Sequence, residues 1–278
     1  MITAFLLVSV ATVSQASLLL YDGFNYADGS ALRGTVSTIW SNNVTGSGAM
    51  ATNRAGSLTY SGLPASVGGK VELAGYKSSS AAPVVKRILT TTYVSNTSLY
   101  ASFILNIPTI GTVQSNGSIS VFSLKSGQGH LVITNNASNP SKFNIGLLST
   151  GGKAVVWDNN GGVGYDQNIS YLIAISATNT SSGTTNAFAQ LWVNPTLGQS
   201  SPSAAKLTTS IANIINSTIE IGVGVGNGAG DPAIRSVIYI DELRVGTTWA
   251  DVTIPEPATV GMLGFGALVT LLIRRLRT

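Results

Sequence analysis

The feature that most constrains the fold of this chain is a series of short runs in which apolar residues alternate with polar or small ones. In 217–225 (STIEIGVGV), Ile219, Ile221, Val223 and Val225 occupy every second position, which is the spacing of one face of a β-strand. Between residues 17 and 254, no long segment has the 3.6-residue spacing of a helix. Eight further runs read as strands: 100–107, 119–124, 130–134, 143–148, 153–157, 171–178, 188–193 and 236–245.

Turn-forming residues separate these runs. The segments 158–162 (DNNGG) and 179–183 are rich in Asn and Gly, which tolerate the positive φ of hairpin turns. The loop 226–232 precedes the last long run. No internal repeat is visible, which disfavours a solenoid or a propeller. We therefore expect an all-β fold, an antiparallel two-sheet sandwich, as one domain over residues 17–254.

Charge and cysteine content exclude several function classes. Only 9% of the residues are charged, against about 25% in average soluble domains. Three of the 15 basic residues lie in the last five positions, and no basic stretch occurs elsewhere, so we expect no nucleic-acid partner. The chain has no Cys, which excludes disulfides, a thiol nucleophile and a Cys-ligated metal.

The N-terminus predicts export. Residues 4–13 (AFLLVSVATV) form an apolar run that is too short to span a bilayer but long enough for the core of a signal peptide. Ser14 and Ala16 supply the small side chains that signal peptidase requires before its cut. We expect a signal helix and signal peptide over residues 1–16, although no Lys or Arg precedes the run. A buried first strand is the alternative.

The C-terminus has three parts. Pro255, Glu256 and Pro257 precede an uncharged run over 258–273, which is followed by an Arg cluster. Sixteen helical residues rise roughly 24 Å, slightly less than the roughly 30 Å of a hydrocarbon core. We expect a marginal transmembrane helix with transient membrane association. The basic cluster should stay cytoplasmic by the positive-inside rule. Its members are Arg274, Arg275 and Arg277.

This arrangement over 255–278 resembles the PEP-CTERM sorting signal of exported bacterial proteins. The matching residues are Pro255, Glu256 and Pro257, the apolar helix and the Arg cluster. The resemblance implies an exosortase as partner, which cuts near the motif. It also implies a Gram-negative-type bacterium that makes extracellular polysaccharide or biofilm. An ordinary C-terminal membrane anchor is the alternative.

A second resemblance concerns the middle of the chain. Segments 18–32 (LLLYDGFNYADGSAL), 188–198 (FAQLWVNPTLG) and 240–252 (IDELRVGTTWADV) are similar to those of the concanavalin A/laminin G-like jelly roll. The resemblance implies that the first and last strands pair beside each other at one edge. That fold serves many functions, so it implies no activity by itself.

We find no catalytic pattern and expect no enzyme. Glycoside hydrolysis usually needs two carboxylates flanking one bond. The adjacent Asp241 and Glu242 should point to opposite faces of a strand. On the strand face that carries Glu220, the next two positions are glycines, so no second carboxylate lies beside it there. His130 is the only histidine, without a Gly-x-Ser-x-Gly elbow, and should lie near the surface at a strand end.

We expect neither a cofactor nor a metal site. Calcium is the one ion for which oxygen ligands could converge, although the Asp-x-Asp-x-Asp-Gly loop pattern is absent. Its candidate ligands are Asp22, Asn25, Asp28, Asn227, Asp231 and Asp241. Among the aromatics, Trp157 beside the 158–162 turn is the best candidate for an exposed glycan contact.

Together these features predict a secreted cell-surface or extracellular-matrix protein of non-enzymatic role, sorted through an exosortase system. It would occupy the inner membrane transiently and then the cell surface or the matrix, in contact with extracellular polysaccharide. A carbohydrate-binding module is the first alternative. A glycan-cleaving enzyme is the second.

Overall fold

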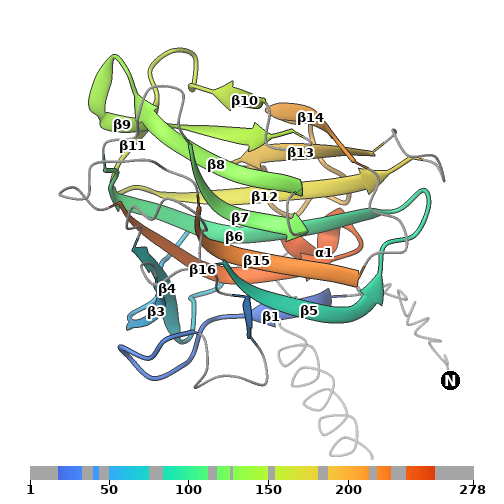
Figure 1. Ribbon diagram of the computed structural model, residues 1–278, viewed down its shortest axis with the longest axis horizontal. Helices are drawn as coiled ribbons and strands as arrows, with labels where there is room; N and C mark the ends of the chain where they lie inside the picture. Colours follow the sequence, from blue (N-terminus) through green and yellow to red (C-terminus); the bar gives the residue numbers. More distant parts are fainter. Residues whose placement is uncertain are drawn as a thin grey trace, which may run out of the picture.

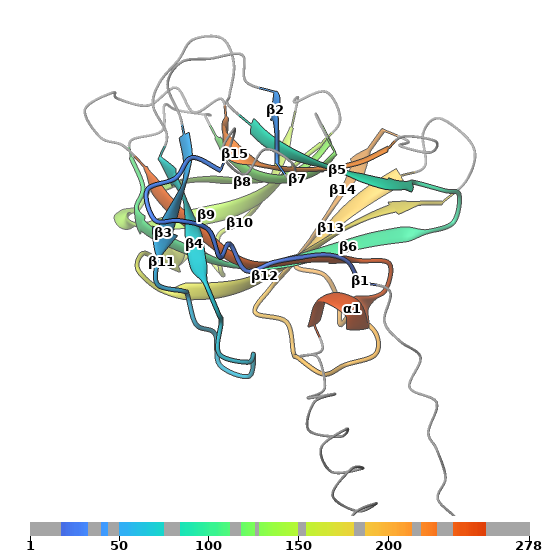
Figure 2. The same ribbon diagram turned by 90° about the horizontal axis from the view of Figure 1, so that it is seen from below.

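In the computed structural model of this chain, the described strands form two eight-stranded sheets in which every pairing is antiparallel. The structure describes residues 18–32, 40–43, 50–74, 84–111, 118–125, 128–149, 154–180, 187–212, 218–226 and 236–253. The sheets stack as two layers (Figure 2), which confirms the predicted all-β sandwich.

Sheet A contains the first and the last of the described strands. Seven of its strands run in the order β14 (Leu207–Ile211), β13 (Ala187–Val193), β12 (Ser170–Asn179), β6 (Ser98–Thr109), β16 (Val237–Gly246), β4 (Gly69–Ala74) and β3 (Met50–Ala55). The eighth, β1 (Leu18–Asp22), pairs with β16. The short helix α1 (Trp249–Thr253) lies on the outside of this sheet (Figure 2).

Sheet B covers the other side of the core. Its strands run in the order β10 (Val155–Asp158), β9 (Asn139–Leu148), β8 (Gln128–Asn136), β7 (Ile119–Lys125), β15 (Thr218–Gly226), β5 (Val84–Thr92) and β2 (Ser41–Asn43). A further short strand, β11 (Tyr165–Asp166), pairs with β9. In Figure 1 the long strands of the two sheets run in similar directions.

Alternating side chains build the core between the sheets. On β6, Leu99, Ala101, Phe103, Leu105 and Ile107 all belong to it. Across the layers, the rings of Phe103 and Phe122 lie 4.7 Å apart. Each of the nine runs predicted from the sequence overlaps a strand, although 153–157, 217–225 and 236–245 begin one or two residues before the strand does.

The first and last strands pair as the jelly-roll resemblance implied. Leu18 lies opposite Gly246 and Tyr21 opposite Arg244. Among the described strands β1 pairs with β16 alone, so β1 is an edge strand of sheet A, whereas β16 also bonds to β6 along its other side. The last strand is thus an interior strand, enclosed by β6 on one side and by β1 and β4 on the other.

A bulge divides β16 into two halves. Ile238 and Ile240 face the core before it, and Leu243 and Val245 face the core after it. This change from even to odd positions requires one extra residue, and the pairing with β6 shifts between Asp241 and Arg244. Glu242 accordingly adopts a φ of 54°, which is rare for a residue with a side chain.

The bulge corrects one prediction from the sequence. Asp241 and Glu242 do not point to opposite faces, because both side chains contact groups on the outer side of sheet A. Asp241 accepts the backbone N–H groups of Leu58 and Glu242, each at 2.7 Å. Glu242 accepts the Tyr21 hydroxyl at 2.9 Å and lies 3.5 Å from the Arg244 guanidinium. Strict alternation fails at this position because the extra residue of the bulge moves the side chains that follow it to the opposite face of the strand.

The segment after β1 is fixed by one buried carboxylate. Asp22 accepts the backbone N–H of Phe24 at 2.8 Å, the Tyr26 hydroxyl at 2.8 Å and the Trp40 indole N–H at 2.9 Å. Phe24 and Trp40 are fully buried, with ring centroids 6.2 Å apart. Asp22 thereby joins the first strand to two large core residues.

The predictions for the two ends are not tested by the structure. The signal helix over 1–16 and the apolar run over 258–273 lie outside the described residues. Among the residues that are described, no helix has the length and apolar character needed to cross a membrane, so the predicted transmembrane helix gains no support here.

We predict that Asp22→Ala strongly destabilises the protein. The substitution leaves up to three donors without an acceptor, and each buried unsatisfied donor costs about 1–3 kcal/mol. Urea denaturation should therefore show a fall of roughly 3 kcal/mol or more in the free energy of unfolding. Asp28→Ala is the matched control, since Asp28 accepts only the exposed Ala55 N–H. Equal urea midpoints for the two variants would contradict the anchoring role of Asp22.

We also predict a pH dependence that originates at Asp241. Burial raises the pKa of this carboxyl to about 7, and the charge of Glu242 adds to the rise, while the N–H groups of Leu58 and Glu242 and the charge of Lys70 oppose it. The folded state therefore binds a proton more tightly than the unfolded state. Its contribution to stability is complete below about pH 4 and is lost as the pH rises through about 7.

Thermal unfolding between about pH 4 and about pH 8 measures this contribution. In Asp241→Asn, which cannot ionise, the decrease in melting temperature over this range should be smaller than in the wild type. Parallel profiles for the two proteins would show that Asp241 is not the titrating group.

Candidate functional site

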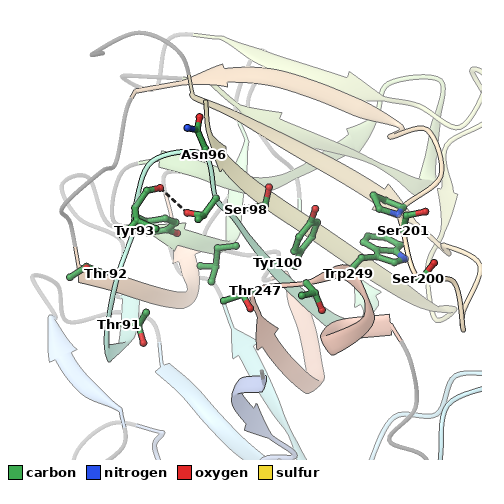
Figure 3. A pocket seen from close by; sticks show the side chains of 15 residues that line it. Thr91, Thr92, Tyr93, Asn96, Ser98, Tyr100, Ser200, Ser201, Thr247 and Trp249 are labelled. Atoms are coloured by element: carbon green, nitrogen blue, oxygen red, sulfur yellow. Dashed lines mark hydrogen bonds between the residues drawn. The ribbon is translucent and has the colours of Figure 1, made fainter. Parts of the chain in front are cut away.

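A hollow in the described structure lies beside the turn between β5 and β6. Its volume is ≈ 530 Å³, which falls within the roughly 300–1,000 Å³ of typical ligand pockets. Figure 3 shows side chains from three separate parts of the chain around it. The lining residues are Thr91, Thr92, Tyr93, Val94, Asn96, Thr97, Ser98, Leu99, Tyr100, Ser200, Ser201, Pro202, Thr247, Thr248 and Trp249.

The chemistry of this pocket is that of neutral hydrogen-bonding groups and aromatic rings. Eight of the 15 lining residues are Ser or Thr, and none is acidic, basic or histidine. A hydroxyl both donates and accepts hydrogen bonds. The pocket can therefore bind polar, uncharged groups, but its lining offers no carboxyl or imidazole for general acid–base chemistry.

Aromatic packing makes one wall of the pocket rigid. Tyr93 is buried, and its hydroxyl donates to the backbone oxygen of Leu124 at 2.8 Å. Burial raises the pKa of Tyr93, which keeps this phenol neutral. The half-buried Tyr100 packs edge-on against Trp249 with centroids 6.0 Å apart, and Trp249 in turn lies 4.9 Å from Trp192.

The hydroxyls of the pocket fall into two groups. One group is engaged in the fold, as in the bond from Thr97 to the Val94 oxygen at 2.7 Å and the contact of Ser98 with Thr178 at 2.8 Å. The other group is exposed and makes no hydrogen bond to another described residue. It consists of Thr91, Thr92, Ser200, Ser201 and Thr247.

Trp157, the predicted glycan contact, does not belong to this pocket. It lies on β10 opposite Gly146 of β9, and 36% of its surface is exposed. A Cβ at Gly146 would approach the indole ring to 2.7 Å, so glycine at that position lets Trp157 lie flat on the sheet. A role for Trp157 in glycan contact stays a prediction.

The turn beside Trp157 differs from the predicted hairpin. Asn160, Gly161 and Gly162 do adopt positive φ. However, β10 and β11 both pair with β9. The segment between them is therefore a loop that starts beside β9 and returns to the same side of β9, not a turn between two strands that pair with each other. Asp158 holds the loop by accepting the Tyr165 hydroxyl at 2.6 Å.

Of the described calcium candidates, the three aspartates are already used by the fold, whereas Asn25 is exposed. Asp22 and Asp241 accept the donors given above, and Asp28 accepts the Ala55 N–H at 2.9 Å. Asn227 and Asp231 lie outside the described residues. Within the described ranges, no group of three or more His, Cys, Asp or Glu side chains could hold a metal ion.

His130 lies near the start of β8 and is half-buried. Burial lowers its pKa, so the ring is neutral at pH 7. Ser123 and Leu148 lie opposite it in the neighbouring strands, and neither supplies a carboxylate to complete a triad.

The processing residues predicted from the sequence are not described by the structure. Ser14 and Ala16 lie before the first described residue. The sorting residues Pro255, Glu256, Pro257, Arg274, Arg275 and Arg277 follow Thr253, the last described residue. The pocket, by contrast, was not predicted, because no local motif marks its three segments.

Comparison with known proteins yields one family match. The family described as "PEP-CTERM protein-sorting motif" matches residues 253–277. No curated protein matches the chain.

Three solved structures have a distant likeness to this chain. An endo-β-1,4-glucuronan lyase from the fungus Trichoderma reesei is 13% identical and has a TM-score of 0.42, with 69% of this chain and 87% of that chain covered. The catalytic domain of a glycoside hydrolase family 131 protein from Coprinopsis cinerea is 14% identical with a TM-score of 0.43, covering 68% and 74%. A glycosyl hydrolase family protein from Mycobacterium fortuitum is 13% identical with a TM-score of 0.44, covering 82% and 99%. Likeness at this level says nothing about the activity of this chain.

The family match confirms the resemblance seen in the sequence at the C-terminus. Its 25 residues begin at Thr253, the last residue of α1, so the match lies next to the folded domain. The motif indicates an exported protein that is processed by an exosortase at the cell surface. This chain therefore carries a PEP-CTERM protein-sorting motif behind a two-sheet antiparallel β-sandwich.

Proposed function

We propose that this protein is a non-enzymatic component of the cell surface or of an extracellular polysaccharide matrix. The observation that carries the proposal is the chemistry of the described pocket, whose lining contains no acidic, basic or histidine side chain. The sorting motif supports delivery to the cell surface. The sandwich is then the part that remains outside the cell.

The environment of the carboxylates supports a non-enzymatic role. Cleavage of a glycosidic bond by two carboxylates needs both groups beside an open groove, roughly 5–10 Å apart. The adjacent pair Asp241 and Glu242 is 0% and 4% exposed. Their oxygens accept hydrogen bonds from the fold, so a substrate would have to displace these contacts. This disfavours the alternative of a glycan-cleaving enzyme.

The route to the surface follows from the two ends of the chain. We propose that signal peptidase removes residues 1–16 after Ala16, with Ser14 as the second small residue. The apolar run then holds the protein transiently in the inner membrane of a Gram-negative-type bacterium. An exosortase recognises Pro255, Glu256 and Pro257, and the protein passes to the cell surface or the biofilm matrix.

A carbohydrate-binding module is the second candidate function. The specific observation in its favour is the set of exposed hydroxyls that line the pocket with the half-buried ring of Tyr100 and have no hydrogen-bond partner among the described residues. This function is compatible with a non-enzymatic surface role.

We predict that Glu256→Ala blocks processing but not export. The substitution removes the one charge of the motif and leaves the apolar run and the Arg cluster intact. The expected product is a full-length, membrane-bound species that mass spectrometry detects in the membrane fraction. Replacement of Arg274, Arg275 and Arg277 by Ser is the contrasting variant. It should weaken membrane retention, because each Arg costs about 2.5–3.5 kcal/mol to insert into hydrocarbon. A wild-type surface protein that still ends in Thr278 would reduce the tail to a plain anchor.

We predict that the protein cleaves no polysaccharide. Incubation with neutral and uronate-containing polysaccharides should release neither new reducing ends nor unsaturated uronates. The double variant Asp241→Asn with Glu242→Gln should give the same background as the wild type. Release by the wild type that disappears in the double variant would establish an enzyme and would overturn the proposed role.

A further inference from the structure

We propose that the pocket beside Tyr100 binds an uncharged saccharide. The proposal adds a ligand site to the proposed surface role. It rests on that role in one respect only, namely that the protein does not cleave the saccharide that it binds.

The first argument is the match between hydrogen-bonding groups. A sugar presents many hydroxyls that donate and accept. Exposed Ser and Thr side chains with no partner among the described residues offer the complementary groups from two sides of the pocket. Thr91 and Thr92 come from the end of β5, whereas Ser200 and Ser201 come from the loop after β13. Such opposed hydroxyls can bind one ligand between them (Figure 3).

The second argument is an unsatisfied donor in the pocket wall. Trp249 is 3% exposed, and its indole N–H has no hydrogen-bond partner among the described groups. A buried donor without an acceptor is unfavourable by about 1–3 kcal/mol. In Figure 3 the indole nitrogen lies toward Ser200, at the side where the exposed hydroxyls begin. Because this nitrogen is buried, a ligand hydroxyl has to displace the groups that cover it before it can supply the missing acceptor.

The third argument concerns the ring of Tyr100. Its edge-on contact with Trp249 fixes its orientation, and it remains half-buried rather than covered. A fixed aromatic ring loses little conformational entropy when it packs against the apolar face of a sugar. Tyr100 therefore gives the pocket an apolar contact to complement its hydroxyls.

Charge selects the class of saccharide. Recognition of a carboxylate or sulfate group normally uses Arg or Lys, and neither lines this pocket. A uronate that entered the pocket would lose the water around its carboxylate without gaining a positively charged partner. The absence of ionisable carboxyl, imidazole, ammonium and guanidinium groups also predicts that affinity does not change between about pH 5 and about pH 8.

The experiment is calorimetric titration of the full-length protein in detergent with four probes, namely cellohexaose, laminarihexaose, mannohexaose and hexagalacturonate. At least one neutral probe should bind, and hexagalacturonate should not. Ser200→Trp fills the pocket and should weaken binding of the neutral probe at least about tenfold. Ser210→Trp, on the exposed side of β14 and outside the pocket, is the matched control and should bind like the wild type. Trp157→Ala should also leave binding unchanged.

Each remaining outcome would overturn a defined part of the proposal. If no neutral probe binds, or if Ser210→Trp weakens binding as much as Ser200→Trp, the pocket is not the site. Loss of binding in Trp157→Ala alone would move the site to β10. Tighter binding of hexagalacturonate would overturn the uncharged class. Recovery of shortened probe after titration would overturn the non-enzymatic role but leave the site in place.

Discussion

The structure depends on the enclosure of β16, because this strand pairs with the first described strand and lies in the interior of sheet A. It pairs with β6 along one side and with β4 and β1 along the other. A single extra residue keeps both halves of β16 facing the core, and the positive φ of Glu242 is the local consequence. The surrounding bonds hold that conformation, since Asp241 accepts the Glu242 N–H and Tyr21 and Arg244 contact the Glu242 carboxylate. The acidic pair that could suggest catalysis is therefore part of the framework.

Much of the fold could be predicted because alternation is a local property of the sequence. Each of the nine predicted runs overlaps a strand, since apolar residues at every second position are the pattern of one face of a strand. The strand β3 (Met50–Ala55) was missed because its sequence, MATNRA, contains neither alternation nor more than one β-branched residue. The bulge in β16 was missed for a different reason. It depends on which face of each half is buried, and this is set by neighbours that are distant in the sequence.

In the candidate site, too, a feature set by neighbouring residues in the sequence could be predicted, and a feature set by distant residues could not. The sorting motif is linear, so a few adjacent residues were enough to recognise it. The pocket is assembled from 91–100, 200–202 and 247–249, and each segment taken alone is an ordinary Ser- and Thr-rich loop or strand end. Trp157 was selected because a turn follows it, which predicts exposure but not the presence of a hollow. A Ser or Thr hydroxyl can bond to many kinds of group, so the sequence does not show which hydroxyls lie together, and only the fold can show it.

The pocket and the sorting motif are connected through α1. Trp249 at its start lines the pocket, and Thr253 at its end is buried and begins the family match. Four residues of helix rise only about 6 Å, so the pocket lies within a short distance of the point where the tail leaves the domain. The hydroxyl of Ser102 on β6 donates to the Val252 oxygen and fixes this end of the helix to sheet A. As long as the tail holds the protein in the inner membrane, a saccharide in the pocket would thus be held beside that membrane. Cleavage at the motif would release the domain and its ligand together, because the pocket residues all precede the motif.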